Sequence, residues 1–218
     1  MIVLKDVLTG DEVTALRSAV ARGDFVDGTT TAGRAAKSVK ANEQLESGAA
    51  RDTVARVVRA ALDRHPLYTA YARPKSVIRT LVSRYTPGMG YGTHTDEPVM
   101  SGKRVDLSFT LFLSDPAGYE GGELVLFGNG EPQTVKLDAG DAVLYPTQLL
   151  HRVEEVRSGE RLAVVGWVRS LIGDPLRRQT LFELDIAVRT LFDTQGKTDV
   201  FDTLANFRAN LTRMWVDD

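Results

Sequence analysis

Short runs of strand-forming hydrophobic residues, separated by polar and turn residues, follow one another through the middle of the chain. The first run, residues 77–85, is rich in β-branched residues, and Gly, Pro, Asp and Ser separate it from those that follow. The later runs cover residues 104–113, 122–127, 133–137, 141–145, 149–156 and 161–169. Many short strands with turn residues between them are typical of an all-β sandwich or barrel. The pattern therefore predicts a double-stranded β-helix, or jelly roll.

Before and after this strand region, the hydrophobic residues recur at helical spacing. Thr9 and Glu12 form a capping box before a predicted helix over 10–22, and a second helix is expected over 48–63. A helix starting near Pro175 and another over 198–215 form a C-terminal hairpin of roughly 40 residues, which is too small to fold alone. The fold class expected is mainly β with flanking helices.

Three regions follow from these patterns. Residues 1–75 form an N-terminal helical and strand support, residues 76–172 form the jelly-roll core, and residues 173–218 form a C-terminal helical subdomain. Within the first region, residues 2–4 are expected to form a short strand and residues 23–37 a loop or weak hairpin.

Composition excludes several classes of protein. With 43% hydrophobic and 26% charged residues and a net charge of −2, the chain is typical of a globular protein, and neither nucleic acid nor a membrane is expected as a partner. It contains no cysteine, so disulfides and thiolate metal sites are absent. No signal-like N-terminus and no run of 18 apolar residues occurs, and a cytoplasmic protein is expected.

One imidazole and one carboxylate lie two residues apart after a glycine-rich turn. On an extended backbone, His94 and Asp96 point to the same side. His151 lies in a strand-like run that facing jelly-roll sheets can bring close to them. Two histidines and one carboxylate with open positions are typical of non-haem Fe(II) oxygenases, although zinc can use the same ligands. The third histidine, His65, precedes Pro66 at a helix end and is assigned no function.

Arg161 lies ten residues after His151, beyond a turn. An antiparallel strand would return it towards the metal site, where a guanidinium suits the far carboxylate of a dicarboxylic co-substrate. The alternative is a surface arginine that pairs with Glu155 or Glu160.

Taken together, several short motifs resemble a known family. They are Arg84-Tyr85-x-x-Gly88, His94-x-Asp96, Gly121-Gly122-Glu123-Leu124, Gly140-Asp141-Ala142-Val143, His151-x-Val153 and Gly159-x-Arg161. In this order and spacing the chain resembles the Fe(II)/2-oxoglutarate dioxygenases, and most of all the bacterial PKHD-type hydroxylases, relatives of prolyl and lysyl hydroxylase domains. The segments Lys40-x-Asn42-x-Gln44-Leu45 and Asp174-Pro175-x-x-Arg178-x-x-Leu181 extend the resemblance over nearly the whole chain.

The resemblance implies roles for individual residues. His94, Asp96 and His151 would be the iron ligands, and Arg161 would bind the distal carboxylate of 2-oxoglutarate. Tyr85 would border the same pocket, and Thr110 would supply a second hydroxyl, with plain packing as the alternative for both. Asn42 and Gln44 would either approach the substrate pocket or form hydrogen bonds within their loop. Trp167 is expected in the core.

The reaction implied is hydroxylation of an unactivated C–H bond in a small-molecule or peptide substrate. It consumes O2 and converts 2-oxoglutarate to succinate and CO2, and ascorbate would serve as the reductant that restores Fe(II). Two alternatives stay open at this point, a cupin-type metalloenzyme with different chemistry and a non-catalytic jelly-roll binding module. The apolar residues of the C-terminal hairpin further predict that it caps the barrel or forms a homo-oligomer contact.

Overall fold

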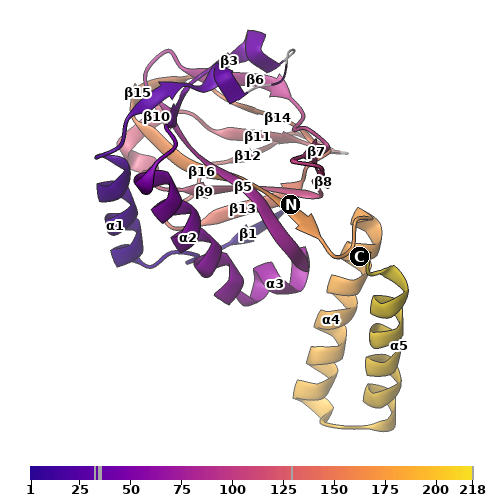
Figure 1. Ribbon diagram of the computed structural model, residues 1–218. Helices are drawn as coiled ribbons and strands as arrows, with labels where there is room; N and C mark the ends of the chain where they lie inside the picture. The colour runs from indigo at the N-terminus through magenta and orange to yellow at the C-terminus, as the bar shows by residue number, and fades with distance from the viewer. Residues whose placement is uncertain (32, 34–35, 129, 218) are drawn as a thin grey trace.

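Two antiparallel sheets face each other in the structure, a computed structural model that describes residues 1–31, 33, 36–128 and 130–217. The larger sheet has seven strands in the order β1-β13-β9-β16-β5-β4-β2, and the smaller has five in the order β12-β11-β14-β6-β3 (Figure 1). Adjacent strands are distant in sequence, as in a jelly roll. The predicted fold class is confirmed.

The strands of the structure coincide with most of the strands predicted from the sequence. The larger sheet contains β1 (Ile2–Leu4), β2 (Phe25–Asp27), β4 (Glu43–Leu45), β5 (Pro74–Tyr85), β9 (Leu107–Phe112), β13 (Ala142–Pro146) and β16 (Arg161–Ser170). The smaller sheet contains β3 (Lys40–Ala41), β6 (Gly90–His94), β11 (Leu124–Phe127), β12 (Gln133–Val135) and β14 (Leu150–Val153). Two further ladders join β7 (Val99–Met100) to β8 (Lys103–Arg104) and β10 (Tyr119–Gly121) to β15 (Val156–Gly159). Four strands of residues 1–75 belong to the two sheets, so this region builds the jelly roll as well as supporting it.

One predicted strand is divided. Residues 149–156 were expected as a single strand, but β14 ends at Val153 and β15 starts at Val156. Between them the chain leaves β14 and crosses to β10, and the Glu155 carbonyl accepts a hydrogen bond from the amide of Gly122 (3.2 Å). Gly121 and Gly122 both have positive φ values, as the predicted turn requires.

Three helices cover the outer face of the larger sheet. They are α1 (Gly10–Val20), α2 (Ala49–Arg64) and α3 (Pro66–Ala72). The capping box at the start of α1 is present, because the amide of Glu12 donates to Thr9 Oγ1 and the amide of Thr9 donates to Glu12 Oε2. Buried side chains of these helices pack with those of β9 and β13 in one hydrophobic cluster. This layer holds the larger sheet in place and leaves its other face free for the site.

The helix α3 was not predicted, since Pro66 was interpreted only as the end of the preceding helix. Proline is equally suited to the first turn of a new helix, where no amide donor is needed. His65 caps this helix, because its Nδ1 accepts a hydrogen bond from the amide of Tyr68 (3.3 Å). His65 thus has a structural role, in keeping with the absence of an assigned function.

Short 3₁₀ turns complete the chain between these elements. They are η1 (Gly28–Thr31), η2 (Ala36–Val39) and η3 (Pro116–Gly118). The range 23–37, expected as a loop or weak hairpin, contains β2, which pairs with β4, followed by η1. Residues 32, 34 and 35 of this range lie outside the described part of the chain.

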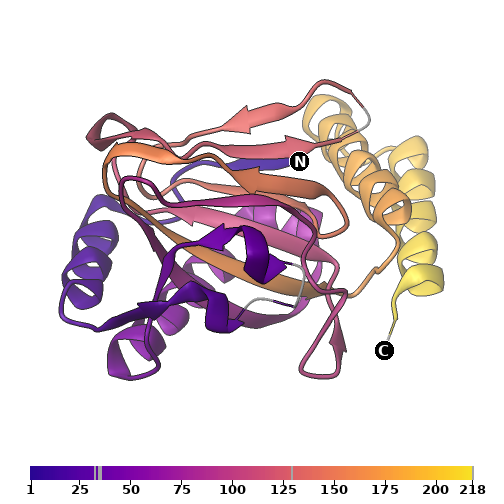
Figure 2. The same cartoon turned by 90° about the horizontal axis from the view of Figure 1, so that it is seen from above.

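The predicted C-terminal hairpin consists of α4 (Pro175–Gln195) and α5 (Asp199–Trp215). It extends away from the sheets (Figures 1 and 2), and α4 contacts α3 through an edge-to-face pair between Phe182 and Tyr71 (5.3 Å between centroids). The hairpin therefore rests on α3 rather than closing the jelly roll. Among the described residues, no helix combines the length and apolar composition needed to cross a membrane; a cytoplasmic location stays a prediction.

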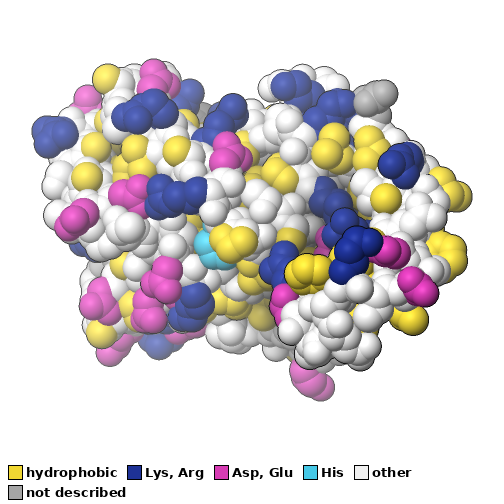
Figure 3. Space-filling view, turned by 90° about the horizontal axis from the view of Figure 1, so that it is seen from below, with side chains coloured by type: hydrophobic (Ala, Val, Ile, Leu, Met, Phe, Trp, Pro, Cys, Tyr) yellow, Lys and Arg dark blue, Asp and Glu magenta, His cyan; other side chains and the backbone are white. Residues whose placement is uncertain are grey.

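Much of the hairpin is exposed. No described residue of α5 is buried, and hydrophobic side chains lie among Lys and Arg side chains on the half of the molecule that the hairpin forms when viewed from below (Figure 3). The prediction of a homo-oligomer contact through these helices stays a prediction.

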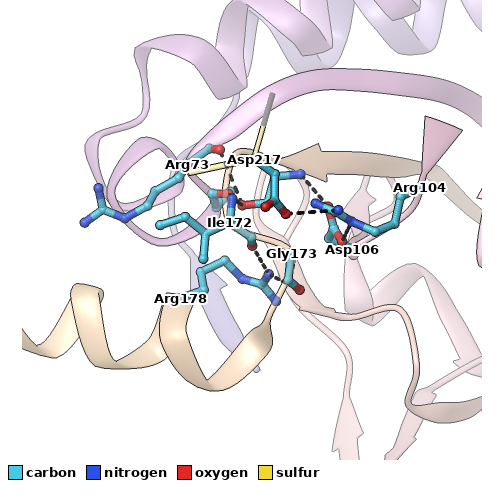
Figure 4. A network of polar contacts seen from close by, with 9 residues as sticks. Arg73, Arg104, Asp106, Ile172, Gly173, Arg178 and Asp217 are labelled. Carbon is cyan, nitrogen blue, oxygen red and sulfur yellow. Dashed lines mark hydrogen bonds and ion pairs between the residues drawn. The ribbon is translucent and has the colours of Figure 1, made fainter. Parts of the chain in front are cut away.

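A polar network attaches the hairpin to the end of β16 (Figure 4). Arg104 donates to Asp106 Oδ1 (2.7 Å) and to Asp217 Oδ2 (3.1 Å), and Asp106 also accepts from the amide of Ser170 (2.8 Å). The buried Arg178 donates to the carbonyl of Ile172 (2.8 Å). Because β16 also carries Arg161, this network fixes one end of a strand that contributes to the site.

Candidate metal and co-substrate site

The three predicted metal-binding side chains meet between the two sheets. His94 ends β6 and lies directly opposite His151 on β14, and Asp96 follows two residues after His94. Asp96 Oδ1 is 3.9 Å from His94 Nε2, and Asp96 Oδ2 is 3.8 Å from His151 Nε2. One ligand atom from each residue lies within 4.8 Å of the other two. The set can hold a single ion, as its spacing in the sequence predicted.

Hydrogen bonds on the far side of each ring fix its orientation. His94 Nδ1 is 2.8 Å from the carbonyl of Gly92, and His151 Nδ1 is 2.9 Å from the carbonyl of Leu149. A carbonyl only accepts, so each Nδ1 carries the proton and each Nε2 presents its lone pair towards Asp96. Such outer contacts set the tautomer of metal-binding histidines.

The charge state of the site suits a divalent cation. Burial, together with the nearby His151, lowers the pKa of His94 to about 4, so this imidazole is neutral near pH 7. The Ser108 hydroxyl on β9 donates to Asp96 Oδ2 at 2.7 Å and orients the carboxylate. Two imidazoles and one carboxylate fit Fe(II), and the same donors are acceptable to zinc.

Arg161 lines the same cavity, and its charge is unpaired among the described residues. Its side chain is 1% exposed, and Nε, Nη1 and Nη2 have no hydrogen-bond partner among the described residues. The alternative of a surface ion pair with Glu155 or Glu160 is wrong, because in the described part of the chain no carboxylate forms a salt bridge with it. A buried and unpaired guanidinium is unfavourable, so this position fits an anionic ligand.

Aromatic rings and a glycine surround this guanidinium. Its Cζ lies 5.1 Å from the centre of the Tyr85 ring and 5.4 Å from that of Phe112. Tyr85 is the residue directly opposite Arg161 on β5. A Cβ atom on Gly122, where φ is +66°, would lie 2.9 Å from Arg161 Cδ. Only glycine leaves room for the arginine in this position.

Tyr85 and Thr110, the other two residues assigned to 2-oxoglutarate, also line the cavity. Both are buried, and burial raises the pKa of the Tyr85 hydroxyl, which therefore stays protonated. The structure thus brings all six predicted site residues to one cavity. The remaining walls come from both sheets and from the segment around η1, and they include Lys40, Arg79, Tyr91, Glu97, Met100 and Tyr145.

Residues at the substrate side differ from the expectations in part. Asn42 and Gln44 both line the cavity. Asn42 makes no side-chain hydrogen bond with any described residue, whereas Gln44 on β4 accepts a hydrogen bond from Thr31 of η1 (2.7 Å). The assignment of Trp167 to the core is wrong. Trp167 is half-buried and lines the cavity, because it lies on the same face of β16 as Arg161 and Val165.

Several cavity residues were not singled out from the sequence. Tyr91 stacks on His94 with 3.6 Å between ring centres, and Tyr145 meets His151 edge-on at 5.3 Å. Ser108 was missed although it lies two residues before Thr110, where the alternation of β9 places it on the same face. This alternation of side chains along the strand is the signal from which Ser108 could have been identified.

Comparisons with known proteins agree with this geometry. Residues 80–169 match the family model described as the 2OG-Fe(II) oxygenase superfamily, and residues 176–217 match the PKHD-type hydroxylase C-terminal domain. A PKHD-type hydroxylase of Maricaulis maris is 52% identical over 218 residues, which is 100% of both chains. One of Acaryochloris marina is 48% identical, again over 100% of both.

Solved structures share the fold at lower identity. A Pseudomonas putida prolyl-4-hydroxylase has a TM-score of 0.56 at 21% identity, with 78% of this chain and 91% of that chain covered. A prolyl hydroxylase of Trichoplax adhaerens has a TM-score of 0.59 at 16% identity, with 77% and 82% covered.

Proposed function

Since the chain belongs to the PKHD-type hydroxylases of the 2OG-Fe(II) oxygenase superfamily, we propose that it hydroxylates an unactivated C–H bond with 2-oxoglutarate as co-substrate. The single observation that carries the co-substrate is Arg161, a buried cation with no partner among the described residues, in the cavity that contains the metal-binding set. The substrate is a small molecule or a peptide.

His94, Asp96 and His151 would hold Fe(II) from one side and leave the opposite side for 2-oxoglutarate and O2. The bound iron supplies the oxidising chemistry, in which one oxygen atom enters the C–H bond and the other enters succinate as 2-oxoglutarate loses CO2. Ascorbate is the reductant we propose for restoring Fe(II).

The residues of the chain position the reactants and keep the metal ligands in place. Arg161 binds the distal carboxylate of 2-oxoglutarate through two parallel hydrogen bonds. The hydroxyls of Tyr85 and Thr110 donate to the same acid from the cavity wall. Ser108 keeps the Asp96 carboxylate turned towards the histidines. Apolar side chains from both sheets, including Leu124, Val153 and Val165, exclude water around these groups.

Arg161 also favours this proposal over the two alternatives. A cupin-type metalloenzyme without a 2-oxo acid has no use for an unpaired guanidinium beside its metal, and a structural module has no use for an orphaned buried charge. A non-catalytic module further predicts that Fe(II) binding, followed by calorimetry, does not depend on Asp96. We expect Asp96→Ala to remove it.

The test is spectroscopic and anaerobic. Adding 2-oxoglutarate to the Fe(II) protein should produce a visible metal-to-ligand charge-transfer band, and Arg161→Ala should require far more 2-oxoglutarate to reach it. Arg178→Ala is the matched control, because Arg178 is equally buried but lies outside the cavity. Absence of the band in the native protein at saturating co-substrate would contradict the proposal.

A further inference from the structure

A second basic position lines the partly exposed end of the cavity, which we call its mouth: Arg79 is exposed and Trp167 half-buried there, whereas Arg161 is fully buried. Along β16, Trp167 follows Arg161 by six residues, which on a strand corresponds to roughly 20 Å. The residue opposite Trp167 on β5 is Arg79, just as Tyr85 lies opposite Arg161. Arg79 and Trp167 both line the cavity. A five-carbon diacid held by Arg161 is too short to reach this pair.

Lys40 provides a further cation on the cavity wall. Lys40 belongs to β3 in the smaller sheet and lines the cavity, so it approaches the site from the sheet opposite to that of Arg79. The pKa of Lys40 is lowered to about 8, mainly by burial and to a smaller extent by the charge of Arg79, while the charges of Asp96 and Asp27 raise it. Lys40 and Arg79 thus place two positive charges on the walls of one cavity, from opposite sheets.

Neither cation forms an ion pair with a carboxylate in the described part of the chain. Within the described residues Arg79 forms no salt bridge, and the Lys40 ammonium contacts only the Thr31 hydroxyl (3.2 Å) and the face of the Tyr91 ring (5.1 Å). By contrast, Arg84 on the same strand as Arg79 is paired with Glu43 at 2.8 Å. Glu97 lines the cavity as well, but it forms no ion pair with either cation in the described part of the chain.

Unused polar groups lie beside these charges. Asn42 is 4% exposed, and neither its amide nitrogen nor its amide oxygen has a hydrogen-bond partner among the described residues. The indole Nε1 of Trp167 is buried and likewise unpartnered there. Buried polar groups in folded proteins are nearly always hydrogen-bonded, so unpaired donors on a cavity wall indicate a ligand.

We propose that the substrate carries an anionic group, a carboxylate or a phosphate, which binds between Lys40 and Arg79 at the mouth of the cavity. Its apolar part lies against Trp167, and the carbon to be hydroxylated reaches inwards to the metal-binding set. This assignment rests on the proposed function, because it takes the inner end of the cavity to be filled by 2-oxoglutarate. Lys40 and Arg79 then select the substrate, and Arg161 selects the co-substrate.

Trp167 can report binding at this position. The chain has two tryptophans, and the other, Trp215, lies on α5 outside the cavity. In a Trp215→Phe background, the emission therefore comes from Trp167 alone. The protein is loaded with Fe(II) and saturating 2-oxoglutarate without O2, and its charge-transfer band is recorded throughout.

Three probes of similar size separate charge from shape: 3-phenylpropionate, phenyl phosphate and the neutral 3-phenylpropanamide. We expect at least one anionic probe to bind more tightly than the amide by a factor of about ten or more. A hydrogen bond to a charged group contributes enough free energy for a difference of this size. Which of the two anions binds more tightly distinguishes a carboxylate from a phosphate. The double variant Lys40→Gln/Arg79→Gln should lose the preference for the anion and keep the 2-oxoglutarate band.

Arg22→Gln is the matched control, because Arg22 is an exposed arginine away from the cavity. Equal affinity for anions and amide in the native protein would overturn the proposal, as would an anion preference that survives in the double variant. Loss of the charge-transfer band as the anion binds would assign the preference to Arg161 and overturn it too. If 2-oxoglutarate gives no band at the outset, the proposed function fails instead. The probes then measure only whether an anion binds at Lys40 and Arg79.

Discussion

Replacing Arg161 with methionine should stabilise the protein that lacks 2-oxoglutarate while abolishing its response to 2-oxoglutarate. The guanidinium is 1% exposed and unpaired among the described residues, so it is held in place at the expense of stability. Methionine fills much of the same volume without a charge and packs readily in irregular apolar surroundings such as the rings of Tyr85 and Phe112. The substitution thus removes the charge and leaves little empty space.

The expected magnitude follows from the burial. Exchanging a buried ion pair for apolar residues of similar volume often stabilises a protein by about 1–4 kcal/mol, and we expect the same range for this unpaired buried charge. For a chain of this length, 1 kcal/mol moves Tm by about 2–4 °C, so the variant should melt roughly 2–15 °C higher than the native protein without ligand. With 2-oxoglutarate at about 100 times its Kd, the native protein should gain about 2.7 kcal/mol, and the variant should gain nothing.

Thermal unfolding measures both effects. The two proteins are loaded with Zn(II), which uses the same ligands without oxidative chemistry, and melted with and without 2-oxoglutarate. Arg178→Met reports what the same exchange does at a buried arginine outside the cavity, where the guanidinium donates to the carbonyl of Ile172. There we expect destabilisation, because a hydrogen bond is lost. A ligand-free Arg161→Met protein that melts below the native one, together with a native Tm insensitive to 2-oxoglutarate, would refute the reasoning.

Three further predictions concern other parts of the molecule. Ser108→Ala removes the hydrogen bond to Asp96, and we expect Fe(II) affinity measured by calorimetry to fall about 10–100-fold; unchanged affinity would show that the carboxylate needs no support. Gly122→Ala places a methyl group 2.9 Å from Arg161 Cδ at a positive φ, so both Tm and 2-oxoglutarate affinity should fall. A variant with the Tm and the 2-oxoglutarate affinity of the native protein would contradict the packing described. If the hairpin is an oligomer contact, Phe207→Ser, at a side chain 57% exposed, should lower the molar mass in light scattering without lowering Tm; an unchanged mass would count against that contact.

The elements most accurately predicted from the sequence are those in which local pattern and tertiary structure agree. The runs over β5, β9, β13 and β16 are short, mostly apolar and separated by turn residues, and the jelly roll follows from their number and spacing. The metal-binding set could be inferred because His94 and Asp96 lie on the same side of one chain segment. His151 could be added to this set only on the assumption that its strand lies close to that of His94.

What the sequence could not provide is the environment of each side chain. Whether Arg161 was paired or unpaired depended on which carboxylates the fold places near it, and no local pattern contains that information. Trp167 was assigned to the core because large aromatic residues in apolar runs usually are, but its side chain shares the cavity face of β16. The helix α3 was missed because Pro66 is compatible with both the end of one helix and the start of the next.

The most direct test of the account is a crystal structure of the anaerobic complex with Fe(II) and 2-oxoglutarate. We predict anomalous density for one iron bound by His94 Nε2, His151 Nε2 and a carboxylate oxygen of Asp96, and 2-oxoglutarate with its distal carboxylate on Arg161. Iron bound elsewhere, or 2-oxoglutarate whose distal carboxylate lies away from a still unpaired Arg161, would contradict the account.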